Sequence, residues 1–334
     1  MIEKTIWRNN LQITYNPNVK THTNTQNPIY FNGFVGNETI RKCGQYIPLR
    51  HETAFFREAD TLEYIVDYLI KTFPNIKTKK VLVGACSTGE EELSLRMLFG
   101  NKCNVKIKGF DLGTKAIKNA NKSFYAISVP KDSPTENYVE YWGISAFGDS
   151  FLAFNKSKLS EKERHLRNLF HKHFREVDVE TKEFGFWNRL KLCFQGLTDF
   201  YMMNMQSKYY RLVDSLKKLN CEYVEGDIRE LEKVTQGEKY HAFTFRNAFY
   251  HLITTNDDYR SQLGPKRTRK ILDGILPQIN KALEMNGIFA IGKKEDEQVC
   301  DMILLTKMLK EYGFQKAVFG NKPYCHIWKK VREC

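Results

Sequence analysis

A strand that turns sharply into a helix constrains this chain more than any other feature. Residues 81–91 read Val-Leu-Val-Gly-Ala-Cys-Ser-Thr-Gly-Glu-Glu, an apolar run followed by small residues and then by acids. An apolar strand, a glycine turn and a helix form the nucleotide site of open α/β sheets. The dinucleotide fingerprint G-x-G-x-x-G is absent from this turn. The competing interpretation is an ordinary strand-to-helix turn.

The acids at the helix start indicate what kind of ligand the turn would accept. Glu90, Glu91 and Glu92 are consecutive and fall in the first helical turn. A helix N-terminus normally attracts phosphate through its free N–H groups and its dipole. Three carboxylates there would repel a pyrophosphate and favour a cationic nucleoside without phosphate. S-adenosylmethionine is the common nucleoside of this kind, so the sequence predicts it as the cofactor, with Gly84 and Glu90 of the turn among the candidate ligands.

A second acid follows at the spacing expected for a ribose-binding residue. Residues 105–111 alternate apolar and polar side chains and end in Asp111, which lies 22 positions after Gly89. An acid about 20 residues past the glycine turn, at the end of the next strand, holds the ribose hydroxyl groups in this class of site. The competing role for Asp111 is to cap the helix expected over 114–124.

Composition narrows the setting of the protein. A hydrophobic share of 42% can fill a core, and no apolar signal stretch or run of ~18 apolar residues is present, so we expect no membrane insertion. The eight cysteines include no C-x-x-C pair, which favours reduced thiols and a cytoplasmic location. The net charge of +13 favours an acidic partner, which could be nucleic acid, anionic lipid or an acidic protein surface, and the charge does not choose among them. Nucleic acid stays open as a partner, although the sequence has no dedicated basic stripe. The oligomeric state has no sequence signal.

Alternating strand and helix patterns predict a mostly parallel sheet. Apolar positions at i, i+3, i+4 and i+7 predict a helix from Asp60 to about Pro74. Strands are expected over 222–227, 240–245 and 288–292, and helices over 267–284 and 297–312, the first of these stopped by Asn286-Gly287. Residues 316–319 and 325–329 read as a closing antiparallel pair. Together they predict the α/β class I methyltransferase architecture, a Rossmann-like, seven-stranded, mostly parallel sheet with a terminal hairpin.

Two regions interrupt this alternation. Residues 1–50 are polar and predict an N-terminal extension to a methyltransferase domain over 51–334. Residues 126–220 are too long and too apolar for a connection, and the charged pattern over 159–174 predicts a helix. We expect 126–220 to be an inserted, mainly helical cap or substrate region. Three histidines in this helix have no carboxylate or cysteine at metal-ligand spacing, so no metal site is predicted.

Several segments together resemble the bacterial chemoreceptor glutamate methyltransferases, the CheR family. Residues 53–58, Thr-Ala-Phe-Phe-Arg-Glu, resemble that family's T-x-F-F-R element. Residues 85–91 are similar to its C-S-T-G-E-E turn, and Arg246-Asn247 after an apolar strand resembles its R-N element. The motifs occur in the family's order, and the resemblance covers roughly residues 50–125 and 220–330.

The resemblance implies a set of cofactor contacts and an acceptor side. Thr53 and Arg57 would approach the methionyl end or the reacting centre. Asp227 and Ile228 would flank the adenine, and Asn247 and Ala248 would meet the cofactor beside the acceptor. Ala85 and Glu91 would line the amino-acid part of the cofactor, and Asp111 would hold the ribose. Arg57 would orient an acceptor carboxylate, and Tyr250 or His251 would line the acceptor pocket.

The acceptor side departs from the family. The family reads R-N-x-x-x-Y-F, whereas His251 stands here in the tyrosine position and Tyr250 comes one place early. The predicted function is methyl transfer to a protein carboxylate, as in glutamate methylation for chemotaxis. The alternatives are a methyltransferase of the same fold that acts on a small molecule or nucleic acid, and a cofactor-binding regulatory protein without transfer activity.

Overall fold

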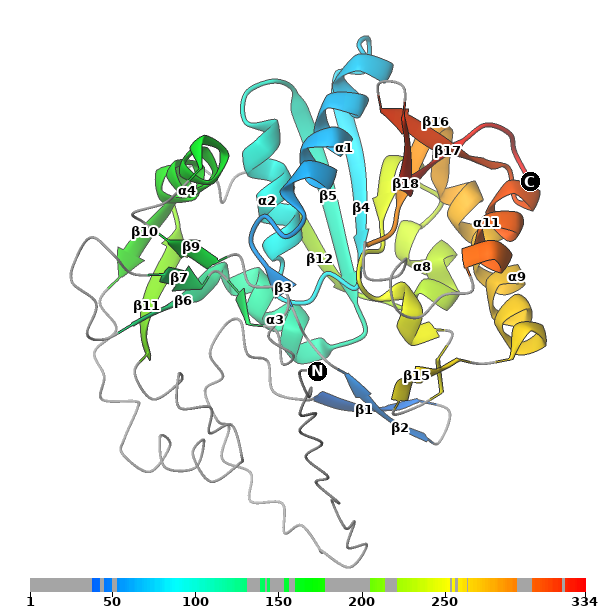
Figure 1. Ribbon diagram of the computed structural model, residues 1–334, viewed down its shortest axis with the longest axis horizontal. Helices are drawn as coiled ribbons and strands as arrows, with labels where there is room; N and C mark the ends of the chain where they lie inside the picture. The colour runs from blue at the N-terminus through cyan, green and yellow to red at the C-terminus, as the bar shows by residue number, and fades with distance from the viewer. Residues whose placement is uncertain are drawn as a thin grey trace, which may run out of the picture.

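The computed structural model describes residues 38–42, 45–49, 53–130, 139–141, 143–144, 153–155, 160–177, 205–213, 221–252, 254–255, 258–262, 264–292, 302–319 and 322–334. Seven strands within these ranges form one sheet in the order β12–β5–β4–β13–β16–β18–β17 (Figure 1). Their bounds, in sheet order, are Cys221–Glu225, Asn104–Asp111, Thr78–Gly84, Tyr240–Thr244, Leu283–Ala290, Lys322–Lys330 and Phe314–Phe319.

The direction of the strands confirms the predicted fold class. Strands β12, β5, β4, β13 and β16 pair in parallel, and β18 runs antiparallel to both of its neighbours, β16 and β17. Parallel strands joined by helices, closed by an antiparallel hairpin, make this a class I methyltransferase fold. Because β4 and β13 are neighbours but far apart in sequence, their carboxyl ends bring distant motifs to one edge of the sheet.

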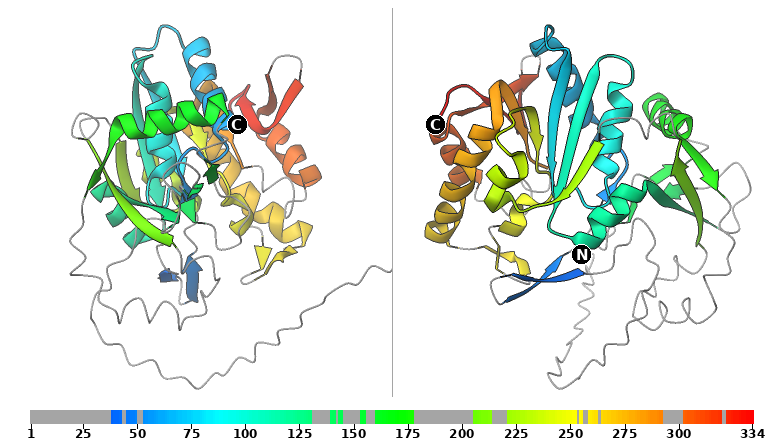
Figure 2. Two further views of the ribbon diagram at one scale, coloured as in Figure 1. Left: turned by 60° about the vertical axis from the view of Figure 1, so that its left-hand side comes forward. Right: turned by 180° about the vertical axis from the view of Figure 1, so that it is seen from behind.

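Helices cover both faces of the sheet, as the two further views show (Figure 2). Val81 and Val83 of β4 belong to one core cluster with α1 and α2, whereas Leu82 between them packs with α8, α9 and α11. This alternation is what a strand buried on both faces requires. The helices span Ala59–Thr72 (α1), Glu90–Phe99 (α2), Thr114–Lys122 (α3), Leu231–Thr235 (α8), Pro265–Ala282 (α9) and Met302–Glu311 (α11).

The helices end close to where the sequence predicts, with one exception. The helix expected over 114–124 stops at Lys122 because Ser123 adopts a left-handed conformation with φ of 49°. The exception is the expected stop at Asn286-Gly287: the helix predicted over 267–284 ends near its predicted end, at Ala282, but the Asn-Gly pair lies within β16, so its assignment as the helix stop is wrong. Asn286 has a left-handed φ of 63° within β16, where the pairing with β13 shifts register. The Asn-Gly pair therefore forms an irregularity inside a strand. Both this irregularity and a helix stop favour residues that tolerate a left-handed backbone conformation.

The region predicted to be a mainly helical insert is mostly strand in its described residues, so that prediction is wrong. Strands β10 (Phe174–Val177), β11 (Met205–Leu212), β6 (Phe124–Pro130), β7 (Val139–Tyr141) and β9 (Ala153–Asn155) form a second, antiparallel sheet in this order. One helix, α4 (Glu161–His173), accompanies them, begun by a capping box. Tyr210 and Leu212 of β11 are buried and Arg211 between them is exposed. This alternation with a period of two is typical of a strand. The prediction of a mainly helical region rested on the charged helical pattern of α4, which describes that one element only.

This second sheet packs against the segment that leads into α1 (Figures 1 and 2). The Phe55 ring lies 4.9 to 5.3 Å, centroid to centroid, from the rings of Tyr125, Phe170 and Phe174. Strand β3 (Thr53–Ala54) pairs with β8 (Gly143–Ile144) in a separate two-stranded sheet. The second sheet thus contacts the segment that carries Thr53 and Arg57. The division into an extension, a domain and an insert stays a prediction.

The remaining elements are short. Strands β1 (Glu38–Lys42) and β2 (Gln45–Leu49) form a hairpin within the predicted extension, whose residues 1–37 lie outside the described ranges. Strands β14 (Thr254–Thr255) and β15 (Asp258–Gln262) form another, and the 3-10 helices η3 (Ile228–Glu230) and η4 (Phe249–Leu252) follow β12 and β13. No helix among the described residues is long and apolar enough to cross a membrane.

Candidate functional site

A pocket lies where the carboxyl ends of β4 and β13 meet the segment before α1 and the first turn of α2. Five of the predicted site residues line it together with four other residues. The predicted ones are Thr53, Arg57, Ala85, Glu91 and Asn247, and the others are Ala54, Leu62, Cys86 and Arg246. Ala85 and Asn247 meet here because β4 and β13 are neighbouring parallel strands, which present their carboxyl ends at one edge of the sheet. This is the edge at which open α/β sheets bind ligands.

Of the three consecutive glutamates at the start of α2, Glu91 is the one that lines the pocket. Its Oε1 accepts a hydrogen bond of 2.6 Å from the Thr244 hydroxyl, and its Oε2 lies 3.4 Å from NH1 of Arg246. Thr244 ends β13 and Arg246 follows it, so a neighbouring strand orients the carboxylate at the start of α2. The remaining capacity of the carboxylate is available to a ligand cation.

Glu90 and Glu92 are buried and do not line the pocket, although the side chain of Glu90 hydrogen-bonds Thr53, which does. Burial raises the pKa of Glu90 to about 7, and the Thr88 hydroxyl bonded to its carboxyl group offsets this only in part. Burial and the nearby charge of Glu91 raise the pKa of Glu92 well above its usual value. The expectation that three carboxylates together repel phosphate at this helix start is therefore wrong. Only Glu91 faces the pocket, because successive helix residues point about 100° apart.

The turn between β4 and α2 is held in an unusual backbone conformation. Ala85 and Ser87 have φ of 53° and 51°, and Gly89, the N-cap of α2, has φ of 92°. Asp111 at the end of β5 accepts 2.8 Å hydrogen bonds from the backbone N–H groups of Ser87 and Gly113. Asp111 therefore supports the turn and the start of α3, and each of its oxygens can accept one more hydrogen bond. Its predicted ribose contact stays a prediction.

The remaining predicted cofactor contacts lie at the same edge but outside the pocket lining. Asp227, after β12, is buried and holds Arg229 through both carboxylate oxygens, the shortest contact being 2.7 Å. Ile228 packs into the core cluster on the α9 face, and Ala248 packs against that cluster. Gly84 lies between the rings of Phe110 and Phe245, where a Cβ atom would come within 2.5 Å of Phe245.

The segment before α1 faces the end of β13 across the pocket. Asn247 donates a 3.2 Å hydrogen bond from Nδ2 to Oε1 of Glu58, while its own Oδ1 is buried without a hydrogen-bond partner. Phe56, Glu58 and Asn247 have φ between 52° and 55°. Non-glycine residues pay for such a conformation with roughly 1 kcal/mol or more, and such residues gather at binding sites. A Cβ atom on Gly292 would lie 2.7 Å from Asn247, so this glycine leaves room for it.

Tyr250 and His251, the predicted acceptor-side residues, both lie in η4, which begins two residues after Asn247. They are therefore close in sequence to Asn247, which lines the pocket. Their predicted roles on the acceptor side stay predictions.

The sequence interpretation missed the part that Arg246 plays in this site. The side chain of Arg246 is fully buried and contacts both Glu58 and Glu91. Arginine directly after a buried strand is an unusual residue there and was a usable signal, since buried charges are rare unless paired. Thr244 carried no such signal, because threonine is common in strands.

The polar groups of the pocket fit the amino-acid end of S-adenosylmethionine. That end carries an ammonium group, for which the pocket offers the Glu91 carboxylate in its lining. The Oδ1 atom of Asn247 is a further hydrogen-bond acceptor and has no partner in the protein. Buried polar groups are normally hydrogen-bonded, so this atom is available to a ligand donor. Asp111 ends β5 and Asp227 follows β12, so both lie along the same edge of the sheet.

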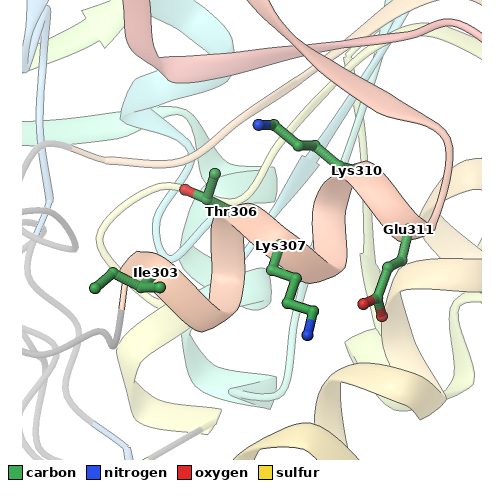
Figure 3. A pocket seen from close by; sticks show the side chains of 5 residues that line it. All are labelled: Ile303, Thr306, Lys307, Lys310 and Glu311. Atoms are coloured by element: carbon green, nitrogen blue, oxygen red, sulfur yellow. The ribbon is translucent and has the colours of Figure 1, made fainter.

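A second hollow lies on α11 and carries none of the predicted residues. Figure 3 shows Ile303, Thr306, Lys307, Lys310 and Glu311 on the exposed side of this helix. Its apolar member, Ile303, is 84% exposed, so the hollow is shallow. The candidate site is therefore the pocket at the sheet edge.

A known protein family matches a segment of the chain that carries part of this pocket. Residues 51–179 match the CheR methyltransferase, SAM binding domain family. This match confirms the suspected CheR-type family over that segment, which carries Thr53, Arg57 and the turn before α2, and it confirms S-adenosylmethionine as the cofactor. No curated protein matches the chain.

Solved structures that resemble the chain are distant. The rRNA methyltransferase AviRa from Streptomyces viridochromogenes is 13% identical, with a TM-score of 0.39, over 85% of this chain and 87% of its own. The CMeT domain of the citrinin polyketide synthase is 10% identical, with a TM-score of 0.39, over 83% of this chain and 53% of its own. The chain spans 49% to 63% of the length of several other matched structures. The assignment of the fold rests on the strand order above.

Proposed function

We propose that this protein transfers a methyl group from S-adenosylmethionine to a carboxylate of a protein substrate. The observation that carries the proposal is the pocket in which Thr53, Arg57, Ala85, Glu91 and Asn247 converge. These residues come from three separate motifs, and each motif resembles an element of the CheR family. The net charge of +13 supports a substrate with an acidic surface.

The residue types in the pocket suit a carboxylate acceptor. The cofactor supplies a methyl group already activated on a sulfonium, so the protein's main tasks are alignment and exclusion of water. A carboxylate is ionised near neutral pH and needs no base to become a nucleophile. Arg57 would hold it through charge-assisted hydrogen bonds. Among the described residues that line the pocket there is no histidine, in keeping with an acceptor that needs no proton removed.

Cofactor binding is tested first, with a measurement that does not depend on the acceptor. Calorimetry with S-adenosylhomocysteine should show binding to a single site, and Arg57→Lys should keep the affinity within about threefold while lowering turnover by ~10-fold or more, since lysine cannot reproduce a planar bidentate contact. Tighter binding of NAD, FAD or ATP than of S-adenosylhomocysteine would contradict the proposal.

The acceptor is tested by transfer of label. The protein is incubated with S-adenosylmethionine labelled on the methyl group and with lysate of its own host. A protein-bound label that is released by mild base indicates a carboxyl methyl ester. A base-stable label on protein, RNA or a small molecule would instead indicate another acceptor, and binding without transfer would indicate a regulatory protein.

The pH dependence separates carboxylate from amine or hydroxyl acceptors. For a carboxylate acceptor the rate should be nearly constant from about pH 6 to 9, and His251→Phe should keep most activity. A rate that rises with a pKa near that of imidazole, about 6.5, and falls strongly in His251→Phe would assign a base role to this histidine and rule out the carboxylate.

A further inference from the structure

We infer that Arg246 is a positioning residue of this site, whose buried guanidinium group holds Glu91 and the segment Arg57–Glu58 in place on opposite walls of the pocket. This inference rests on the proposed function, because it assigns the residue a part in binding the same cofactor.

The guanidinium group joins three segments of the chain. Its NH2 atom donates a 2.6 Å hydrogen bond to the backbone carbonyl of Arg57 and lies 3.6 Å from Oε2 of Glu58. Its NH1 atom lies 3.4 Å from Oε2 of Glu91. Arg57 and Glu58 precede α1, and Glu91 begins α2. A single side chain at the end of β13 therefore sets the distance between the two walls.

The residues on either side of Arg246 complete the attachment. Thr244 donates to Oε1 of Glu91, and Asn247 donates to Oε1 of Glu58. Each carboxylate thus contacts Arg246 through one oxygen and a neighbour of Arg246 through the other. Two points of contact fix the plane of a carboxylate as well as its place. The end of β13 consequently orients both acids, of which Glu91 faces the ligand.

The way Arg246 is buried argues against a purely stabilising role. Its side chain is fully buried, yet Nε and NH1 have no hydrogen-bond partner that meets normal geometry. A buried charge left partly unsatisfied costs free energy, and arginine cannot lose its proton to escape that cost. Apolar residues often replace buried ion pairs without loss of stability. We infer that an arginine is present at this costly position because it orients the two acids, Glu58 and Glu91.

The backbone at both ends of the network supports the same role. Glu58 and Asn247 each adopt a left-handed conformation, with φ of 52° and 55°. Such conformations persist when surrounding contacts over-determine them. The bonds from Arg246 and Asn247 to the Arg57–Glu58 segment provide those contacts. Loss of Arg246 would let this segment relax and would move Arg57 with it.

The experiment compares Arg246 with a matched buried cation elsewhere. Lys330 in β18 is also fully buried, and its Nζ bonds to the carbonyls of Asn280 and Leu283 and to Glu333, at the opposite edge of the sheet where β16 begins. Arg246→Met should weaken S-adenosylhomocysteine binding, measured by calorimetry, by ~10-fold or more. Lys330→Met should lower the melting temperature but keep the affinity within about twofold at a temperature where the protein is folded.

A double-mutant cycle tests whether Arg246 acts through Glu91. In a Glu91→Gln protein, Arg246→Met should weaken binding clearly less than it does in the wild type. Arg246→Lys should restore only part of the affinity, because an ammonium group cannot reach both walls. If Arg246→Met does not fold, Arg246→Lys and Thr244→Val take its place, and both should lose affinity several-fold.

The outcomes separate this inference from the proposed function. Wild-type protein that fails to bind S-adenosylhomocysteine would overturn the proposed function. Wild-type protein that binds it, with Arg246 variants that bind equally well, or with Arg246 and Glu91 effects that are additive, would overturn the positioning role alone.

Discussion

Three consecutive glutamates at the start of α2 have three different environments. Glu91 lines the pocket, Glu90 bonds to Thr88, and Glu92 is buried with neither carboxyl oxygen in a conventional hydrogen bond. The Cys86 thiol near Glu92 offsets the effect of burial on its pKa only in part. Identical residue types thus supply one ligand group and two core groups, and the difference comes from the direction in which each side chain leaves the helix.

These buried acids make stability depend on pH. Burial raises the pKa of Glu90 from 4.5 to about 7, so its contribution is fully present below pH 4.5 and is lost as pH rises through 7. The shift corresponds to about 3 kcal/mol at alkaline pH. We expect Glu90→Gln to remove this loss, so that its stability exceeds that of the wild type increasingly from pH 5 to 8. Urea unfolding at several pH values measures it.

The same reasoning applies to Glu92, whose pKa is raised in the same direction. Glu92→Gln should also flatten the pH dependence. Parallel stability curves for the wild type and both variants over this range would show that neither acid is protonated in the folded protein.

At the scale of elements, the close packing of α2 on β5 depends on a residue without a side chain. Gly109 lies in β5, and a Cβ atom there would run into the Glu92 carboxyl group and lie 3.0 Å from the Tyr223 ring. Gly274 in α9 has nothing within 4 Å of the corresponding position. A side chain at position 109 would therefore clash with its neighbours, whereas a side chain at position 274 would have free space.

We expect alanine at these two glycines to act in opposite directions. Gly109→Ala should destabilise the protein by roughly 1–3 kcal/mol, the usual cost of inserting an atom into a packed core. Gly274→Ala should stabilise it by about 0.5–1 kcal/mol, since alanine restricts the unfolded chain and favours the helix. Thermal unfolding of both variants measures the two effects, and a stabilised Gly109→Ala protein would contradict the packing described.

At the scale of the whole molecule, the second sheet reaches the cofactor turn through Tyr125. This side chain is buried, and its hydroxyl donates a 2.9 Å hydrogen bond to the carbonyl of Thr88 in the turn before α2. The ring also packs on Phe55. A change in the second sheet can therefore alter the shape of the pocket.

Removal of this hydrogen bond should weaken cofactor binding. Tyr125→Phe keeps the ring and leaves a buried carbonyl unpaired, which costs about 1–3 kcal/mol. We expect S-adenosylhomocysteine affinity to fall several-fold. Tyr210→Phe is the control, since Tyr210 packs in the same aromatic cluster but bonds toward Glu176, away from the turn. Equal affinity in both variants would mean that the second sheet does not support the turn.

The net charge of +13 predicts that binding of the proposed acidic protein substrate depends on the salt concentration. Salt screens attraction between exposed charges, with a Debye length of about 10 Å at 0.1 M. The KM for an acidic acceptor should rise several-fold between roughly 0.05 and 0.3 M salt, while S-adenosylhomocysteine affinity changes little. A salt-independent KM would argue for an uncharged acceptor.

The sequence by itself determined the class of the fold and most of the pocket. Strand and helix periods are local properties, and the motifs around Thr53, Gly89 and Asn247 occur in short continuous segments. They were sufficient to predict a parallel sheet, its closing hairpin and the five predicted residues that line the pocket.

Only the tertiary structure decided what depends on neighbours distant in sequence. It showed that 126–220 is mostly strand in its described part, because short strands acquire their identity from pairing partners. It also separated Glu91 from Glu90 and Glu92 and brought Arg246 between two acids that lie more than 150 positions earlier in the chain. Burial and charge pairing are properties of the packed molecule, and no local pattern of residues specifies them.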